Sequence, residues 1–299
     1  MRDIAVLDRE LLAVKEVAEK IACDKLSPKK VKDSAIKTYF QIKCAVDTYR
    51  QEYPKQEANA RNNKDIPYTS INEYKKALEN KSVLSIAFGA SLMDDIDQVK
   101  LLSEKMPVMC SDVAVSWLIG KGIYPRYITC LDANIPAERV PEYDMDGVTV
   151  FCSIAANNNY VMTCYNQGAT IVFFSTECRI GTHLELARIA NVPECLPISG
   201  NVSFGQDYIC LSVMNCNKLY IAAHDYCFSF YYYPDAFYPG DLDKDIMEKR
   251  ILQTLDKNQD AVYTSIQLML YKDFFLDYLY ATGLNKKVIN LSNYGLLNI

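Results

Sequence analysis

The chain has 299 residues, of which 50% are hydrophobic, enough for one large α/β domain with an appendage or for two small domains. The formal net charge is −5. This acidic balance argues against a function in sequence-independent nucleic-acid binding, which usually needs a basic face. Phosphorylated small molecules remain candidate ligands, because the N-terminal end of a helix can hold an anion in an acidic protein.

Two helices are predicted at the N-terminus, over residues 3–23 and 29–53, where apolar residues recur at helical spacing. Ser27 and Pro28 separate them, and a polar stretch, KQEANARNNKDIP, separates the pair from the rest of the chain. We interpret residues 1–66 as a helical appendage and residues 67–299 as the main domain. The appendage either covers the main domain or forms an arm for a homo-oligomer, because exposed apolar stripes often bind partners.

The first glycine turn lies in SVLSIAFGASLMDDIDQV, residues 82–99. This segment predicts a buried strand, a tight turn at Gly89 and a helix that opens at Ser91. Gly89, Ala90 and Ser91 would then place backbone N–H groups at the carboxyl edge of a sheet, where a phosphate can bind. Ser91 followed by Asp94 also fits a capping box, which would give Ser91 a purely structural role.

From residue 80 onward, short apolar runs alternate with helical patterns. Strands are predicted over residues 83–87, 108–110, 127–131, 148–153, 170–174, 219–223 and 287–291, and helices over 94–105, 113–121, 180–190, 203–216 and 262–282. This alternation indicates an α/β fold with a doubly wound, mostly parallel, Rossmann-like sheet. The aperiodic region 226–245 is interpreted as a long loop, and such loops often form lids or binding elements.

Polar residues follow the predicted strands at Ser111-Asp112, Asp132-Ala133-Asn134 and His224-Asp225. Ligands of open α/β sheets bind outside the carboxyl ends of the strands, so the three aspartates would point toward one crevice. Grouped carboxylates suit Mg²⁺ with a polyphosphate, a hydroxyl to be deprotonated, or a ribose. Each aspartate could instead cap the helix that follows it. Because adjacent strand residues point to opposite faces, we favour Asp225 for binding and keep His224 as a candidate general base.

A second turn contains Ser199, Gly200 and Asn201, ahead of the helix expected near residue 203. It is another candidate anion site, with an ordinary N-cap as the alternative. The chain has neither GxxxxGK[ST] nor a full GxGxxG, which excludes a P-loop enzyme and disfavours a dinucleotide site.

Eleven cysteines are scattered singly, and several lie inside apolar runs. This usage is typical of small core residues in a reducing compartment. The N-terminus is charged and lacks a signal-peptide hydrophobic region, and the most apolar long run, IQLMLYKDFFLDYLY, contains three charged residues. We therefore expect a cytoplasmic protein without a membrane span.

Four segments resemble the MptE-like domain family over about residues 80–299: FGASL with its acidic helix, CSDVAVSWLIGKGIYPRYITCLDAN, SGNVSFGQDYICLSVMNCNKLYIAAHD and KKVINLSNYGLL. That family includes archaeal 6-hydroxymethylpterin diphosphokinases and bacterial motility accessory factors. The middle segment also resembles thiamine pyrophosphokinases, in which acidic residues at matching strand ends bind a magnesium nucleotide. The two glycine turns are similar to those that hold CMP in bacterial sialyltransferases.

The chain departs from the family pattern in three places. The first turn has one glycine and no proline where the family usually has G-x-G-P-S-L, and Arg126 stands where an aspartate is common. No histidine follows in the tyrosine-rich loop, where a sialyltransferase-like base would be expected. These departures give weight to a catalytically inactive nucleotide-binding or interaction protein.

The resemblance implies a nucleotide-dependent transferase, and we favour a glycosyltransferase of the motility accessory factor type with a CMP-activated nonulosonic (sialic-acid-like) sugar. It implies nucleotide binding by residues 89–91, Ser111, Asp112, Asn134 and residues 199–201, and catalytic roles for Asp132, His224 and Asp225. The alternative is a pyrophosphokinase that moves diphosphate from ATP to a hydroxymethylpterin-like alcohol. In that case Mg²⁺ would be held by Asp112 and Asp132, joined by Asp225; otherwise no cofactor is expected. The acceptor would be a small molecule or a protein.

Overall fold

The computed structural model describes residues 4–176, 182–198, 201–227 and 251–299. Most of the loop predicted over residues 226–245 therefore lies outside the described residues, as do Ser199 and Gly200 of the second turn.

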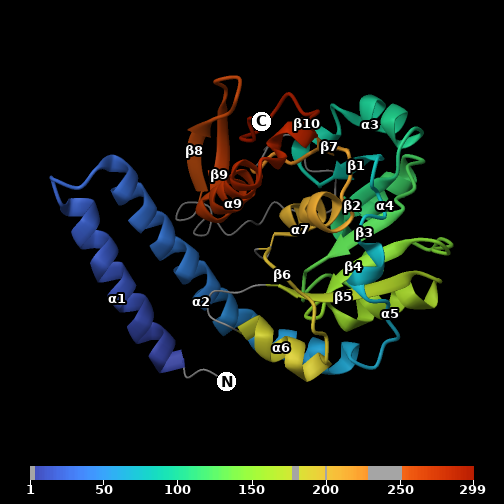
Figure 1. The fold of residues 1–299 in the computed structure, drawn as a ribbon, viewed down its shortest axis with the longest axis horizontal. Helices are drawn as coiled ribbons and strands as arrows, with labels where there is room; N and C mark the ends of the chain where they lie inside the picture. Colours follow the sequence, from blue (N-terminus) through green and yellow to red (C-terminus); the bar gives the residue numbers. More distant parts are fainter. Residues whose placement is uncertain (1–3, 177–181, 199–200, 228–250) are drawn as a thin grey trace.

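Eight of the described strands form one parallel sheet in the order β10-β7-β1-β2-β3-β4-β5-β6 (Figure 1). Their bounds are Ser82–Ile86 (β1), Val108–Ser111 (β2), Tyr127–Cys130 (β3), Thr149–Ser153 (β4), Thr170–Thr176 (β5), Cys195–Leu196 (β6), Lys218–Ala222 (β7) and Val288–Asn290 (β10). The chain builds the sheet outward from β1 to β6 and then returns to place β7 on the other side of β1. This reversal is the switch point of a doubly wound fold.

The described helices are Ile4–Cys23 (α1), Lys29–Asn63 (α2), Ile96–Ser103 (α3), Val115–Gly120 (α4), Asn158–Asn166 (α5), Thr182–Ala190 (α6), Val202–Tyr208 (α7) and Ile266–Thr282 (α9). Residues Ile209–Val213 extend α7 as a short π-helix. The remaining short helices are of the 3₁₀ type, at Ile71–Tyr74, Ala90–Leu92, Asp112–Ala114, Ala137–Arg139 and Leu284–Lys287.

Successive residues of the central strands enter two separate cores, one on each face of the sheet. In β4, Val150 and Cys152 belong to the core beneath α3, α4 and α5, whereas Phe151 belongs to the core beneath α7 and α9. Figure 1 shows these two groups of helices on opposite sides of the sheet. Burial on both faces explains why the strands are almost continuously apolar, and it confirms the doubly wound α/β fold predicted from the sequence.

The polar stretch after residue 53 is part of a helix, which corrects its interpretation as a separating segment. Helix α2 continues through Pro54 to Asn63, and Asn59 and Asn63 are buried. The Asn59 amide donates to the carbonyls of Ala133 and Ala155, at 3.2 and 3.0 Å. These buried amides donate to loop carbonyls that are not paired within the sheet. The polar residues of this stretch therefore form hydrogen bonds inside the protein and do not mark a solvent-exposed linker. The division into domains at residue 66 stays a prediction.

Two further local predictions differ from the structure. The helix predicted over residues 262–282 begins only at Ile266, because Ser265 caps it by accepting a hydrogen bond from the Leu268 N–H at 3.1 Å. The preceding residues form strand β9 (Ala261–Ser265), which pairs antiparallel with β8 (Ile251–Leu255). Helix α5 was not predicted; the Asn157 side chain caps it by accepting from two backbone N–H groups.

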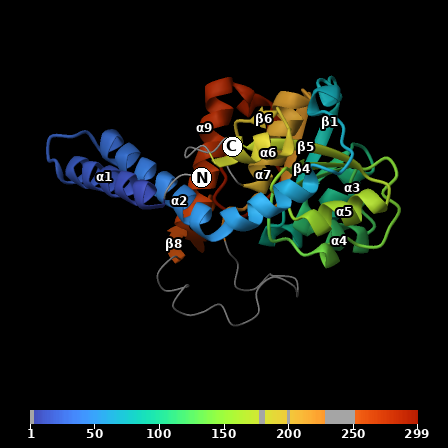
Figure 2. The same cartoon turned by 90° about the horizontal axis from the view of Figure 1, so that it is seen from below.

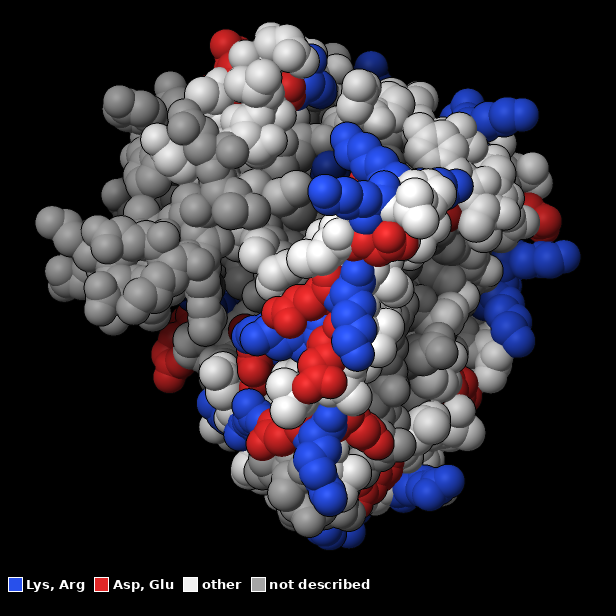
Figure 3. Space-filling view, turned by 90° about the vertical axis from the view of Figure 1, so that its left-hand side faces the viewer, with Lys and Arg blue, Asp and Glu red and all other residues white. Residues whose placement is uncertain are grey.

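Helix α1 and the first half of α2 form an antiparallel hairpin that projects from the rest of the molecule (Figures 1 and 2). Figure 3 shows the side on which this hairpin lies, where basic and acidic residues are interspersed through the middle of the face. Helix α2 carries ion pairs between residues one helical turn apart, such as Lys43 and Asp47 at 2.5 Å. None of the described helices combines the length and the apolar character that a membrane crossing requires.

Candidate functional site

A cleft of about 1100 Å³ opens at the carboxyl edge of the sheet, over the ends of β2, β3, β4 and β5. Helices α2 and α9 form two of its walls, and the start of α7 forms another. Four of the predicted site residues line it: Asp112, Asp132, Asn134 and Asn201. The cleft therefore brings together residues that lie up to 89 positions apart, from 112 to 201.

Asp132 and Asn134 form a small turn on the floor of the cleft. The Asp132 Oδ1 atom accepts from the Asn134 N–H at 2.8 Å, and the Asp132 residue is exposed. Two residues of α2 hold the Asn134 side chain: Lys55 donates to its Oδ1 at 2.6 Å, and its Nδ2 donates to Glu52 at 2.5 Å. The long N-terminal helix thus positions a predicted site residue that belongs to the sheet edge.

Asp112 is buried at the end of β2, with 2% of its surface exposed. Its Oδ1 accepts from the Val113 N–H at 2.8 Å, but its Oδ2 has no hydrogen-bonding partner among the described residues. Burial raises the pKa of Asp112 to about 7, with a further contribution from the Asp132 charge, and the Cys130 thiol offsets this only in part. The Ser111 hydroxyl beside it is also buried and without a described partner. Unpartnered buried oxygens of this kind are uncommon in folded proteins.

The first glycine turn follows β1, the neighbour of β2 in the sheet, and binds a carboxylate of the chain itself. The Ser91 N–H donates to the Asp225 Oδ2 at 2.8 Å, and the Ser91 hydroxyl donates to the Oδ1 at 2.6 Å. A Cβ atom at Gly89 would lie 2.5 Å from both the Ala223 carbonyl oxygen and the Asp225 Oδ2, so only glycine fits there. Ala90 is buried in the same turn. Asp225 thus occupies the position proposed for a ligand phosphate, and neither it nor the turn is among the described residues that line the cleft.

Burial raises the pKa of Asp225 to about 6, although the two hydrogen bonds from Ser91 oppose this rise. The Ser292 hydroxyl contacts the Ser91 hydroxyl at 2.8 Å and accepts from the Ala223 N–H at 3.1 Å. The ends of β1, β7 and β10 are therefore joined by one buried polar cluster at the switch point of the sheet.

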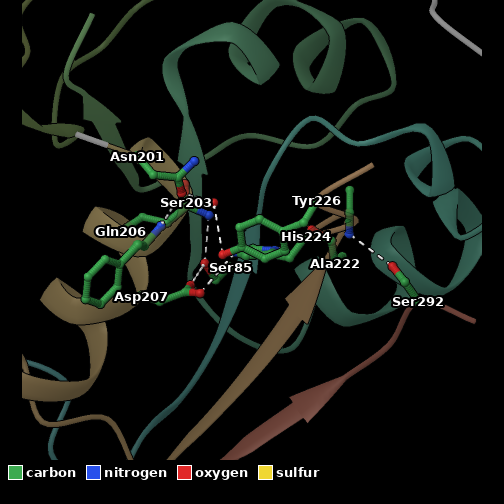
Figure 4. A network of polar contacts seen from close by, with 11 residues as sticks. Ser85, Asn201, Ser203, Gln206, Asp207, Ala222, His224, Tyr226 and Ser292 are labelled. Carbon is green, nitrogen blue, oxygen red and sulfur yellow. Dashed lines mark hydrogen bonds and ion pairs between the residues drawn. The ribbon is translucent and has the colours of Figure 1, made fainter. Parts of the chain in front are cut away.

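His224 belongs to a different buried network, between β7, β1 and α7 (Figure 4). Its Nε2 lies 3.1 Å from the Asp207 Oδ2, and its Nδ1 lies 2.9 Å from the Ala222 carbonyl oxygen, which can only accept. The Ser85 hydroxyl donates to the Asp207 Oδ1 at 2.5 Å. Burial alone would lower the pKa of His224, but the neighbouring Asp207 outweighs it and the pKa is raised. The side chains of His224 and Asp225 are both buried, and neither residue is among the described ones that line the cleft.

In the second turn, Asn201 caps α7. Its Oδ1 accepts from the Phe204 N–H at 2.9 Å and from the Ser203 hydroxyl at 2.5 Å. This is the N-cap that the sequence offered as the alternative to an anion site. Asn201 nevertheless lines the cleft, so its amide remains a candidate ligand contact.

Sequence reasoning missed the two helical walls of the cleft. Helix α2 contributes Gln41, Thr48, Gln51 and Gln56 among others, and α9 contributes Gln267, Tyr271, Phe274 and Tyr278. The sequence feature that could have indicated these walls is the high content of polar and aromatic residues in the two segments with helical spacing. Ser153 and Thr176, at the ends of β4 and β5, also line the cleft.

No group of three or more metal-ligating side chains is found within the described part of the chain. Asp112 and Asp132 are the predicted magnesium ligands that share the cleft, whereas Asp225 is already bound by Ser91. The ten cysteines of the described ranges are all free thiols.

The fold is similar to that of the Maf glycosyltransferase from Magnetospirillum magneticum AMB-1, with a TM-score of 0.57 and 13% sequence identity. The similarity covers 99% of this chain and 46% of that protein, so the chain spans less than half of its length. No curated protein matches the sequence. Residues 56–229, more than half of the chain, match the family described as 6-hydroxymethylpterin diphosphokinase MptE-like. On the extent of that match, the chain belongs to the MptE-like family.

Proposed function

We propose that this protein is a glycosyltransferase that uses a CMP-activated nonulosonic sugar as its donor. Family membership supports a transferase, and the fold shared with a Maf glycosyltransferase is compatible with glycosyl transfer. The observation that carries the proposal is the large cleft over the carboxyl edge of the sheet, where ligands of α/β folds bind. Asp112, Asp132, Asn134 and Asn201 meet there, although they come from separate strand ends and turns.

In the proposed reaction, a hydroxyl oxygen of the acceptor attacks the anomeric carbon of the donor sugar. The bond between that carbon and the phosphate oxygen breaks, and CMP leaves with the electron pair. Asp132 is exposed on the cleft floor, where it orients the donor together with Asn134 and accepts the hydroxyl proton as a general base. Asn134 and Asn201 carry amide groups suited to donor hydroxyls, and α2 holds the Asn134 side chain in place. Asp225 and His224 have structural roles in this proposal.

A specific observation favours a pyrophosphokinase as the second candidate. The described residues that line the cleft include no lysine or arginine, yet they include Asp112 and Asp132. A polyphosphate in such a cleft would need a cation to offset its charge. Carboxylate oxygens are the ligands that Mg²⁺ prefers, and the unpartnered Asp112 Oδ2 is available. When bound, the ion would neutralise charge on the transferred group, and Asp112 and Asp132 would hold it.

Thermal-shift measurements with CMP, CDP, ATP and GTP, each with and without Mg²⁺, separate the candidates. Binding to the native state alone raises the melting temperature, so a shift reports occupation of the folded protein. Stabilisation by CMP without metal supports glycosyl transfer. Magnesium-dependent stabilisation by ATP supports the pyrophosphokinase. If no nucleotide changes the melting temperature, both proposals fail and an inactive interaction protein is favoured.

We predict that Asp132→Asn abolishes stabilisation by the nucleotide, because the donor loses a contact that orients it, and leaves the protein folded, because the side chain is exposed. Asp144→Asn is the matched control: Asp144 is also exposed and accepts from the N–H two residues later, at 2.9 Å, but it does not line the cleft. Normal nucleotide binding by Asp132→Asn would refute the site assignment.

The proposal includes self-association through the projecting hairpin of α1 and α2. Leu12 and Val17 on α1 are each 55% exposed, and Leu26 in the connecting turn is 92% exposed. Apolar side chains grouped on one projecting element are a common basis for contact between copies of a chain.

A further inference from the structure

We infer that the part of the cleft between α2 and α9 is a subsite for a neutral saccharide, which serves as the acceptor. The inference rests on the proposed glycosyltransferase function and names its acceptor class. It depends on the chemistry of the two helical walls, on the charge of the cleft and on where the walls lie in the sequence.

Neutral polar groups dominate the two walls. Helix α2 presents the amides of Gln51 and Gln56 and the hydroxyl of Thr48, and α9 presents the amide of Gln267. An amide both donates and accepts hydrogen bonds, and so does a hydroxyl. A sugar ring displays several hydroxyls with the same double capacity, so such walls can pair with it without a net charge on either side.

Aromatic rings stand beside these polar groups. Tyr208 and Tyr278 pack with ring centroids 5.3 Å apart, and both line the cleft. The Tyr278 hydroxyl is paired with the Ser212 hydroxyl at 2.6 Å, and the Tyr271 hydroxyl accepts from Gln267 at 2.5 Å. These contacts fix the rings. A saccharide has an apolar face of C–H groups as well as its hydroxyls, and an aromatic ring with a polar tip matches both.

The charges of the described lining residues favour a neutral acceptor over an anionic one. The charged residues among those described as lining it are Glu52, Asp112 and Asp132, all of them acidic. A carboxylate or sulfate on the acceptor would therefore meet like charges in a partly desolvated space, which weakens binding. A neutral acceptor avoids this repulsion.

Apart from Gln56, the residues of the two walls lie outside the segment that the family shares. Residues 56–229 carry the strand ends and α7, whereas the lining residues up to Glu52 and all those of α9 fall outside this range. Lys37 of α2 forms ion pairs with two carboxylates of α9. Its Nζ lies 2.8 Å from the Asp277 Oδ2 and 3.5 Å from the Asp273 Oδ2. The shared segment thus supplies the sheet edge, and elements outside it supply the acceptor walls.

The test uses ligand-observed NMR with the full chain and four probes: lactose, cellobiose, a disaccharide containing glucuronic acid, and a peptide of alternating serine, glycine and threonine. We expect one or both neutral disaccharides to bind and the acidic disaccharide and the peptide not to bind. Tyr271→Leu, which removes the ring but keeps an apolar side chain, should weaken disaccharide binding roughly tenfold, the effect expected for loss of an aromatic contact. Tyr271→Phe, which keeps the ring, should bind nearly as well as the parent.

Tyr280→Leu is the matched control, because Tyr280 lies on the same helix, is 59% exposed and is not among the cleft-lining residues. Circular dichroism confirms that each variant is folded. The inference is overturned if the peptide or the acidic disaccharide binds instead, if no disaccharide binds, or if Tyr280→Leu weakens binding as much as Tyr271→Leu. CMP stabilisation measured on the same samples separates the outcomes: CMP binding without saccharide binding refutes this inference alone, and saccharide binding at Tyr271 without nucleotide binding refutes the donor proposal.

Discussion

At the scale of single residues, Asp225 shows how a turn suited to an anion can be satisfied from within. Ser91 offers it a backbone N–H and a hydroxyl at hydrogen-bonding distance, as it would offer them to a phosphate. Gly89 permits the close approach, because any side chain there would collide with Asp225. Asp112 differs: it is equally buried, but the residue lines the cleft and its Oδ2 has no hydrogen-bonding partner among the described residues. An unsatisfied oxygen at a ligand-accessible edge is the stronger indication of function.

The raised pKa of Asp112 makes a prediction about stability. Burial and Asp132 raise it from 3.8 to about 7, so between these values the folded state binds more protons than the unfolded state. Stability contributed by this group therefore falls as the pH rises through that window. Asp112→Asn removes the effect. Its free energy of unfolding should equal that of the parent near pH 4 and exceed it by up to about 4 kcal/mol above pH 7, at about 1.36 kcal/mol per pKa unit.

Urea denaturation of both proteins across this pH range measures the difference. Asp144→Asn, at an exposed position, should track the parent at every pH. A constant offset between Asp112→Asn and the parent, independent of pH, would contradict the assignment.

At the scale of elements, α2 links the projecting hairpin to the sheet edge. Its buried residues Tyr53 and Ala60 belong to the same core as Leu84 of β1. Its last turn is anchored by Asn63, whose amide donates to the carbonyls of Ile154 and Ala156, both at 2.9 Å. The wall of the cleft and the anchor of the helix are thus parts of one element, so a change at the anchor should affect the wall.

We predict that Asn63→Ala lowers the free energy of unfolding by about 2–4 kcal/mol, because it leaves two buried carbonyls without donors. Chemical denaturation measures the loss. Asn62→Ala changes the exposed neighbour on the same turn and should alter stability by less than about 0.5 kcal/mol. Equal effects of the two substitutions would show that the buried hydrogen bonds of Asn63 carry no particular weight.

At the scale of the whole molecule, the switch point of the sheet and the cleft are two different places. The switch point lies between β1 and β7, and there Ser91, Asp225 and Ser292 fill the space with hydrogen bonds. The cleft lies beside it, over β2 to β5, and helices from both ends of the chain complete it.

The projecting hairpin gives the prediction at this scale. If α1 mediates self-association, Leu12→Lys with Val17→Lys should convert an oligomer into a monomer, because two charges would be buried in the contact. Sedimentation velocity measures the mass of the particle. Leu101→Lys on α3, where the side chain is 53% exposed, is the control and should leave the oligomer intact. A monomeric parent protein would refute this part of the proposal.

The residue pattern alone predicted the α/β class and every strand of the sheet except β6, because strands buried on both faces are continuously apolar and the helices between them are amphipathic. The same pattern placed Asp112, Asp132 and Asn134 just after strand ends, because the apolar run of a buried strand gives way to polar residues where the chain leaves the sheet. It could not separate Asp225 from these, because a carboxylate that caps a turn and one that faces a cleft have the same local pattern.

Which polar residues meet became visible only once the helices were packed on the sheet. The amides of Asn59 and Asn63 looked like those of a linker, yet they bind carbonyls more than 70 positions away. Tyr271 and Tyr278 looked like ordinary helix residues until α9 was placed across from α2. Contacts between segments distant in the chain depend on how the helices pack on the two faces of the sheet, and local periodicity carries no information about that packing.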